Sequence, residues 1–596
     1  MASSLENRVN RTLGRLAPWL LGSLLLYWFL PTWVWHVRRT FDPYTFNDDA
    51  RILIWPFLRE ADPRLFPSDP FVPYYLAGLP EGYLALFRLV GRLGGTKATS
   101  EVLQYISVLS VATTLAATAR RIGGNVAAFL AVALVLGSDA FFDRAGGGLP
   151  RSFAFPLVSA GLYALVAVRP RLLAVLTVAG AAFYPVVSAL LGIALGLLLV
   201  LPSQWRCDEC LDRDCDHLRS KIVWPSWRER ITWLSVTLLA VVVLVTPMSL
   251  RLQPYGAPIT PAMLHEFPEA GLGGRLTREQ HPPFESFPIV LARHVRGTLV
   301  GHGEPIAGFT AAWLHRTDKT RNLVVSLVIS AAAIRWLMVA RRRPRLLRPW
   351  LLLLASLLGH SAACLVAPRL FLPERYVQYG VPPLVVLLVA CGFGGALAKV
   401  RAECPQRIRD WVTAAMLLAL VGTKGSSYVG VEVYVPPRRR ALYEEISQLP
   451  RHAVVAGWPA GPMENVPYLS KRRVLTNFQL EMPFHRGFTL QSRARLQALF
   501  EAYFATSVRP ITRLCSEFDV THFLIDKTHF TIATPTYYAP HRAELARLVA
   551  GTAPTEAWFY RMRHHPSIRH FEGDVDLVDL SQFPELAPAC SARQAQ

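Results

Sequence analysis

Long apolar runs are the feature that most constrains this chain. Hydrophobic residues make up 52% of its 596 residues and charged residues 18%, and the apolar residues are gathered in blocks. A helix needs about 20 such residues to cross a hydrocarbon layer about 30 Å thick. The blocks therefore predict a polytopic α-helical membrane protein with about eleven crossings. The runs lie at about 16–35, 101–119, 126–142, 152–168, 172–184, 186–202, 231–247, 323–340, 349–367, 377–398 and 411–423.

Two stretches have an alternative interpretation. The run 16–35 follows basic residues as a signal peptide would, but no cleavage site with small residues follows it, so we expect a retained helix. The stretch 172–202 can be one long kinked helix. Because it is too long for a single crossing without strong tilt, its break at Tyr184-Pro185 favours two short helices.

The distribution of basic residues predicts the topology. With eleven crossings and a cytoplasmic N-terminus, the short basic loops all lie inside, as the positive-inside rule requires. These loops are 120–121, 169–171, 203–230, 341–348 and 399–409. The loops 36–100 and 248–322, and everything after Thr423, then lie outside. The net charge of +21 is spread between the apolar runs, so we do not expect a nucleic-acid partner.

The chain divides into a transmembrane domain, 1–423, and an extracytoplasmic α/β domain, 424–596. In the second domain "HAVVAGWP" and "THFLID" predict strands, and "RRRALYEEISQL" and "SRARLQALFEAYFA" predict helices. In the loop 36–100, "ARILIWPFLRE" and "GYLALFRLVGRL" predict short amphipathic helices on the membrane surface. Arginines outnumber lysines 56 to 7, which favours a bacterial source.

Three polar motifs at the outer ends of helices can carry chemistry. Asp48 and Asp49 in "TFNDDARILIWPF" can bind a divalent cation or accept a proton, or they simply begin a helix. Asp139 and Asp143 precede the glycines 146–148 and Arg151, a pattern that suits a metal and a phosphate as well as an ordinary interfacial loop.

The third motif is "LFLPERYVQYG", which contains Glu374, Arg375 and Tyr376. Charged side chains near lipid are costly unless they are paired or bind a ligand. Arg375 is therefore a candidate for binding phosphate oxygens, or else the partner of Glu374 in a structural ion pair.

Cysteine and histidine residues give weaker signals. Cys207, Cys210, Cys215 and His217 are enough ligands for zinc, although their spacing fits a plain cytoplasmic loop better. Cys515 and Cys590 lie outside and can pair, whereas Cys364 and Cys391 lie in apolar runs. The loop 248–322 also offers several possible ligands, among which the sequence does not choose: His265, Glu266, Glu269, His281 and Glu285.

The layout resembles the GT-C class of membrane glycosyltransferases, which includes oligosaccharyltransferases, protein mannosyltransferases and aminoarabinose transferases. The resemblance lies in the paired acids after the first helix, the acid at the end of the third, the later Arg at a helix mouth and the external domain. "NDDARILIWPFLREADPRLFPSDPF" and "LPRSFAFPL" also look similar to uncharacterised bacterial proteins of this type. No WWD-type motif is found in the tail, unlike in an oligosaccharyltransferase.

The resemblance implies transfer of a sugar from a polyprenyl-phosphate carrier to an acceptor of the cell envelope, at the outer face of a bacterial inner membrane. Asp48 would be the general base, with Asp49 the second choice. Asp139 or Asp143 would help hold a divalent metal such as Mg²⁺ or Mn²⁺. Arg375, with Arg151 and Tyr376, would bind the donor phosphate. The alternatives are a transporter or lipid flippase, and a non-catalytic scaffold for envelope assembly.

Overall fold

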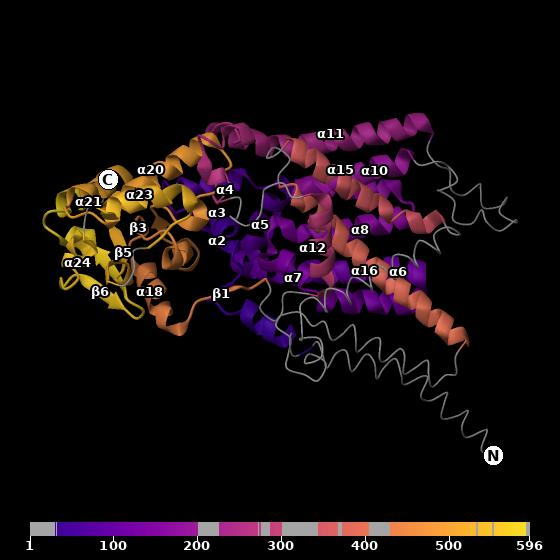
Figure 1. The fold of residues 1–596 in the computed structure, drawn as a ribbon, viewed down its shortest axis with the longest axis horizontal. Coiled ribbons are helices and arrows are strands. Elements are labelled where there is room, and N and C mark those ends of the chain that lie inside the picture. The colour runs from indigo at the N-terminus through magenta and orange to yellow at the C-terminus, as the bar shows by residue number, and fades with distance from the viewer. Residues whose placement is uncertain are drawn as a thin grey trace, which may run out of the picture.

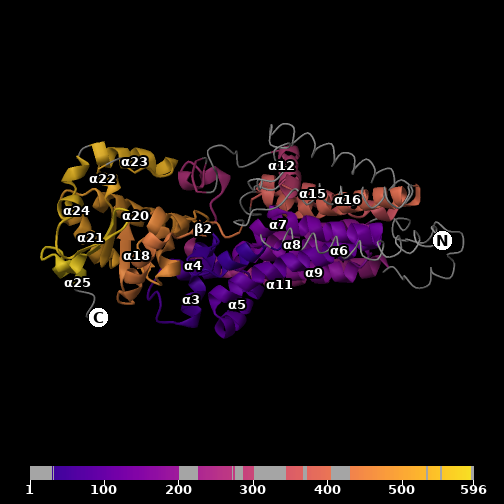
Figure 2. The same ribbon diagram turned by 90° about the horizontal axis from the view of Figure 1, so that it is seen from below.

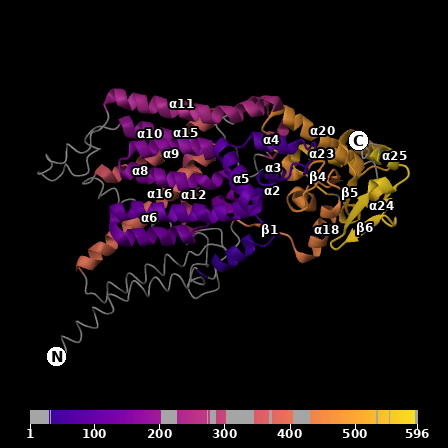
Figure 3. The ribbon, with the colours of Figure 1, turned by 180° about the vertical axis from the view of Figure 1, so that it is seen from behind.

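A bundle of helices and an α/β domain lie at opposite ends of the molecule, with the helices of residues 50–94 between them (Figure 1). The computed structural model describes residues 30, 33–200, 226–271, 273–275, 286–300, 344–366, 372–403, 430–531, 535–550 and 553–591. The predicted runs 323–340 and 411–423, most of the run 16–35 and the domain boundary at 423 lie outside these residues. The same end-to-end arrangement is seen from below and from behind (Figures 2 and 3).

The bundle is built from apolar helices. They are α6 (Thr96–Gly137), α7 (Asp139–Ala145), α8 (Ala154–Val166), α9 (Pro170–Phe183), α10 (Pro185–Val200), α11 (Trp227–Leu252), α12 (Phe287–Val300), α15 (Trp350–Val366) and α16 (Glu374–Glu403). Of the described helices, Thr96–Gly137, Trp227–Tyr255 and Glu374–Gly394 are long and apolar enough to cross a membrane. Only 6% of the apolar window of α11 is buried in the protein. Such an exposed apolar helix needs lipid around it, which identifies a membrane protein; the number of crossings stays a prediction.

Helix α6 contains two predicted crossings. A straight helix of its 42 residues would be about 63 Å long. Yet Ser100, near its beginning, donates a hydrogen bond to the carbonyl oxygen of Gly147, just beyond its end. Both ends can meet because the backbone reverses at Gly124, whose φ is +79°. The runs predicted at 101–119 and 126–142 are therefore two antiparallel helices.

The stretch 172–202 also forms two helices, as predicted. Helices α9 and α10 are separated at Tyr184 and Pro185. They approach closely because Gly180 has no side chain: a Cβ there would lie 2.7 Å from the backbone nitrogen of Ser188. The predicted runs 152–168, 231–247, 349–367 and 377–398 correspond to α8, α11, α15 and α16.

The loop 36–100 packs mainly against protein. It contains β1 (Thr45–Phe46), α2 (Ala50–Leu53), α3 (Pro56–Ala61), α4 (Phe71–Ala77) and α5 (Glu81–Gly94). Ile52 and Trp55 are buried in one cluster with residues of the C-terminal domain. The prediction that "ARILIWPFLRE" lies on the membrane surface is therefore wrong. Helix α5 buries Tyr83 and Phe87 but exposes Leu89 and Leu93, as an interfacial helix would.

The C-terminal domain is a mixed five-stranded sheet flanked by helices. The strand order is β4 (Arg473–Val474), β3 (Val454–Gly457), β5 (His522–Asp526), β7 (Val575–Asp579) and β6 (Ile568–Phe571). Strand β3 is parallel to β4 and β5, whereas β7 is antiparallel to β5 and β6. The helices are α18 (Pro437–Gln448), α19 (Val466–Leu469), α20 (Arg486–Tyr503), α21 (Arg509–Phe518), α22 (Thr528–Thr531), α23 (Ala539–Ala550), α24 (Trp558–Arg561) and α25 (Ala587–Ser591).

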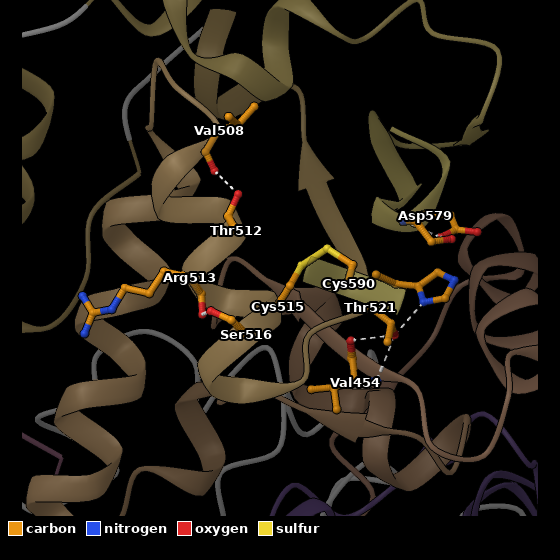
Figure 4. The surroundings of a disulfide bond; sticks show 11 residues. Val454, Val508, Thr512, Arg513, Cys515, Ser516, Thr521, Asp579 and Cys590 are labelled. Atoms are coloured by element: carbon orange, nitrogen blue, oxygen red, sulfur yellow. Dashed lines mark hydrogen bonds between the residues drawn. A yellow bond between two sulfur atoms is a disulfide. The ribbon is translucent and has the colours of Figure 1, made fainter. Parts of the chain in front are cut away.

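The two strands and two helices predicted in this domain are present as β3, β5, α18 and α20. Strands β4, β6 and β7 were not predicted. A disulfide between Cys515 in α21 and Cys590 in α25 fastens the last helix to the domain (Figure 4). Cys515 and Cys590, which the sequence analysis found able to pair, thus form a disulfide.

Candidate active site

The paired acids are held by a two-stranded ribbon between the membrane end and the C-terminal domain. Strand β1 pairs antiparallel with β2 (Val433–Tyr434), so that Thr45 faces Tyr434 and Phe46 faces Val433. Asp48 and Asp49 follow β1 after one residue, Asn47, and Asp49 is the N-cap residue of α2. Its side chain accepts no capping hydrogen bond, so capping the helix does not explain this carboxylate.

Asp49 instead faces arginines from three separate helical elements. Arg151, in the 3-10 turn Pro150–Phe153 before α8, forms an ion pair with the Asp49 carboxylate. Burial alone would raise the pKa of Asp49, but the charges of Arg151, Arg375 and Arg144 lower it below its ordinary value. We call these four residues the Asp49 cluster.

Arg375 lies in the first turn of α16. One of its guanidinium nitrogens donates to Gln378 Oε1 at 2.7 Å and lies 3.5 Å from the hydroxyl of Tyr379. The Tyr379 hydroxyl is in turn 3.5 Å from that of Tyr184, at the turn between α9 and α10. The sequence predicted that Asp48 and Arg375 face one cavity, but the acid whose charge interacts with Arg375 is its neighbour Asp49.

Asp48 points to the C-terminal domain. Its carboxylate pairs with Arg51 and accepts a 3.4 Å hydrogen bond from Gln479. Arg51 also donates to Asn465 at 2.9 Å and lies 3.6 Å from Glu464. The two adjacent acids therefore have different partners: Asp48 joins the loop to the C-terminal domain, and Asp49 faces the helix bundle.

Asp139 and Asp143 do not form a metal site with other acids. Asp143 pairs with Arg144 at 2.8 Å, and Asp139 is buried at the start of α7, with 1% of its surface exposed. Among the described residues, no group of three or more Asp, Glu, His or Cys side chains converges as metal ligands would. The acids here do not fit a bound divalent cation, and we derive no chemical step through one.

Glu374 and Tyr376 flank Arg375 but face other elements. Glu374 accepts a 3.0 Å hydrogen bond from His294 of α12 and lies 3.5 Å from Arg293. Tyr376 is buried, and its ring fills the space left by Gly359 of α15, where a Cβ would overlap it. His294 and Arg293, which pair with Glu374, thus both lie on α12 and anchor the first turn of α16.

The glycine turn 146–148 makes room for the ribbon. A Cβ on Gly146 would lie 2.5 Å from the Cα of Gly430, and one on Gly147 would lie 2.8 Å from the Cβ of Asn47. Gly147 also has a φ of +74°, which other residues rarely adopt. This close packing brings Asn47 beside Arg151, with Asn47 Oδ1 3.4 Å from the guanidinium.

Sequence reasoning missed Asn47, Arg144, Glu432 and Gln479. Asn47 and Arg144 adjoin residues that were singled out, so their neighbourhood was a signal. No pattern in "GVEVYV" or "TNFQLE" indicates that Glu432 or Gln479 belongs to a site. Their positions follow from pairings across about 400 residues of chain, which a single sequence does not reveal.

The remaining candidates lie elsewhere. Glu266 pairs with Arg486 at 3.2 Å and Glu269 with Arg493 at 2.6 Å, while His265 contacts the carbonyl of Ala262. Glu266 and Glu269 thus fasten this part of the loop to α20. The possible zinc ligands Cys207, Cys210, Cys215 and His217, and also His281 and Glu285, lie outside the described residues.

No family model and no curated protein matches the chain. Among solved structures it is similar to the oligosaccharyltransferase AglB from Archaeoglobus fulgidus in complex with an inhibitory peptide and a dolichol-phosphate. The identity is 12% over 91% of this chain and 72% of that one, with a TM-score of 0.44. It is also similar to ArnT from Cupriavidus metallidurans bound to undecaprenyl phosphate, with 16% identity over 87% of this chain and 95% of that one and a TM-score of 0.40.

A second structure of the A. fulgidus oligosaccharyltransferase, in complex with Zn and sulfate, matches with 12% identity over 89% of this chain and 70% of that one, at a TM-score of 0.41. AglB and ArnT are GT-C membrane glycosyltransferases, the class whose layout the sequence resembles. Because every one of these TM-scores is below 0.5, we base the proposed function on the contacts of the Asp49 cluster and not on the likeness.

Proposed function

We propose that this chain is a GT-C-like glycosyltransferase that moves a sugar from a polyprenyl-phosphate-linked donor to an acceptor of the cell envelope. The observation that carries the proposal is the Asp49 cluster: one carboxylate that makes no capping hydrogen bond, paired with Arg151 and subject to the charges of Arg375 and Arg144, at one end of an apolar bundle. A base for a hydroxyl and cations for a phosphate are the two groups that such a transfer needs.

The chemistry can be written with this chain's own residues. The acceptor hydroxyl attacks the anomeric carbon of the sugar while the bond from that carbon to the phosphate oxygen breaks. The hydroxyl proton passes to Asp49, and the electron pair of the broken bond stays on the departing polyprenyl phosphate. Arg375 and Arg151 stabilise the resulting negative charge through paired N–H groups.

Donor binding would also activate the base. In the free protein the arginine charges lower the pKa of Asp49, which makes it a weak proton acceptor. A bound phosphate would share Arg151 and Arg375 with the carboxylate. The pKa of Asp49 would then rise, so proton transfer would be favoured only when the donor is present.

An apolar groove that begins at Pro185, beside the turn between α9 and α10, suits the carrier's hydrocarbon chain. Its volume is about 520 Å³, and α9, α10 and α11 line it with apolar and hydroxyl side chains. It extends along α10 from Pro185 to Leu195, which is about 15 Å of helix. Pro185 follows Tyr184, whose hydroxyl leads through Tyr379 to Arg375. A phosphate at Arg375 could thus be continuous with a chain in the groove.

An outer-face location in a bacterial inner membrane agrees with two features. The basic loops favour a C-terminal domain outside the cytoplasm. The Cys515–Cys590 disulfide in that domain is typical of an oxidising compartment.

The contacts favour Asp49 over Asp48 as the base, and substituting each of the two acids separately tests this. Asp49→Asn keeps size but removes the base, so we expect a loss of roughly 10²–10⁴-fold in transfer at normal abundance. Asp48→Asn serves as the matched control and should keep most activity. The assay is the recovery of envelope glycans when each variant is expressed in a deletion strain. Full recovery by Asp49→Asn would refute the enzyme mechanism, and unchanged glycans in the deletion strain itself would favour the transporter or scaffold.

A further inference from the structure

The segment that enters the C-terminal domain passes beside the Asp49 cluster. The β1–β2 register pairs Thr45 with Tyr434 and Phe46 with Val433. One step further along the ribbon, the same antiparallel register sets Asn47 opposite Glu432. Their side chains do meet, because Asn47 Nδ2 donates to Glu432 Oε2 at 3.2 Å.

Asn47 uses its full hydrogen-bonding capacity. Its amide nitrogen donates to Glu432 and to the carbonyl oxygen of Gly430, both at 3.2 Å. Its oxygen accepts from the backbone N–H of Asp49 at 3.1 Å and from Arg151 at 3.4 Å. Asn47 is 3% exposed, so little water can replace these partners. An amide has two donors and two acceptor positions, and here each has a partner.

Glu432 allows only one orientation of this amide. Its second oxygen accepts the Gly430 backbone N–H at 2.9 Å, which fixes the carboxylate. An ionised carboxylate only accepts hydrogen bonds, so the Asn47 nitrogen must face it and the Asn47 oxygen must face Arg151. The reverse orientation would place an NH₂ group against a guanidinium and an oxygen against a carboxylate.

We infer that Glu432 is a positioning residue for the donor-phosphate site, because its carboxylate orients Asn47 and Asn47 holds Arg151 and the Asp49 backbone. The inference rests on the proposed function. It also means that the segment leading into the C-terminal domain is part of the site, although about 380 residues of sequence separate it from Asp49.

Binding of undecaprenyl phosphate to the purified full-length protein in detergent tests the role. Glu432→Ala should weaken binding roughly tenfold, the scale of one hydrogen bond to a charged group. Asn47→Ala should weaken it by a similar factor. The double variant should bind no worse than either single variant, because both remove the same link. Glu432→Gln should lose less, roughly threefold, because it keeps an acceptor for Asn47 but sets its own NH₂ against the Gly430 N–H.

Glu444→Ala is the matched control. It removes the 2.7 Å hydrogen bond from Tyr44 to Glu444 of α18, a contact between the β1 segment and the C-terminal domain that does not involve Asn47. It should leave binding unchanged. Three results would each overturn the positioning role. Glu444→Ala could weaken undecaprenyl phosphate binding as much as Glu432→Ala does, or Glu432→Ala could bind it normally. The third is a double variant whose loss of affinity equals the product of the two single losses.

Arg375→Ala separates this inference from the proposed function. If Arg375→Ala weakens binding while Glu432→Ala does not, only the positioning role fails. If Arg375→Ala binds undecaprenyl phosphate normally, the proposed phosphate site itself is wrong.

Discussion

Glu481 should make the stability of the C-terminal domain depend on pH. Its carboxylate is buried and accepts hydrogen bonds from Thr476 and Tyr537, both at 2.9 Å. Burial raises its pKa from 4.5 to about 7, despite these hydrogen bonds. The folded state therefore binds this proton more tightly than the unfolded state does. Its contribution is fully present below about pH 4.5 and is lost as the pH rises through about 7.

The size of the effect follows from the shift. One pKa unit corresponds to about 1.36 kcal/mol, so a change from 4.5 to about 7 removes about 3 kcal/mol of stability. That is a change of roughly 100-fold in the opening equilibrium. Glu481→Gln keeps the size and the neutral form of the side chain at every pH, so it should abolish this dependence.

Amide hydrogen exchange of β5 in the full-length protein is a suitable measurement, after correction for the intrinsic pH dependence of exchange. Protection of β5 should fall by roughly 100-fold between pH 4.5 and 8 in the unmodified protein, and much less in Glu481→Gln. Glu585→Gln is the control, because Glu585 is exposed. If the unmodified protein and Glu481→Gln keep a constant ratio of protection over this range, the reasoning is wrong.

Three other outcomes are expected. Arg375→Lys keeps the charge but loses the planar fork, so the KM for the donor should rise more than kcat falls in steady-state kinetics. Replacing Cys515 and Cys590 by Ser should lower the stability of the C-terminal domain by roughly 2–5 kcal/mol in denaturant unfolding. Gly147→Ala should reduce transfer more than abundance, because its Cβ would press on Asn47; glycan analysis and quantified folded protein separate the two.

The sequence predicts the elements of this fold better than their partners. The apolar runs give α8, α9, α10, α11, α15 and α16 closely, because lipid imposes a length and an apolar composition that one sequence displays. The same logic fails for α2 and α3. Their apolar faces read as membrane-facing, but Trp55 is buried in a cluster with the C-terminal domain, and hydrophobic patterning does not tell whether lipid or protein covers a face. Strand β4 has two residues, too few to display a period.

The candidate site illustrates the same limit within two adjacent residues. Asp48 and Asp49 are chemically identical, and the resemblance to GT-C enzymes placed Asp48 first as the base. At the start of α2 their side chains diverge, so that Asp48 meets Arg51 and Gln479 while Asp49 meets Arg151. Their difference in function therefore resides in the arginines and amides that distant segments bring to each carboxylate. Glu432 belongs to the same group of distant partners: its neighbours in sequence say nothing of Asn47, and the ribbon register alone brings the two together.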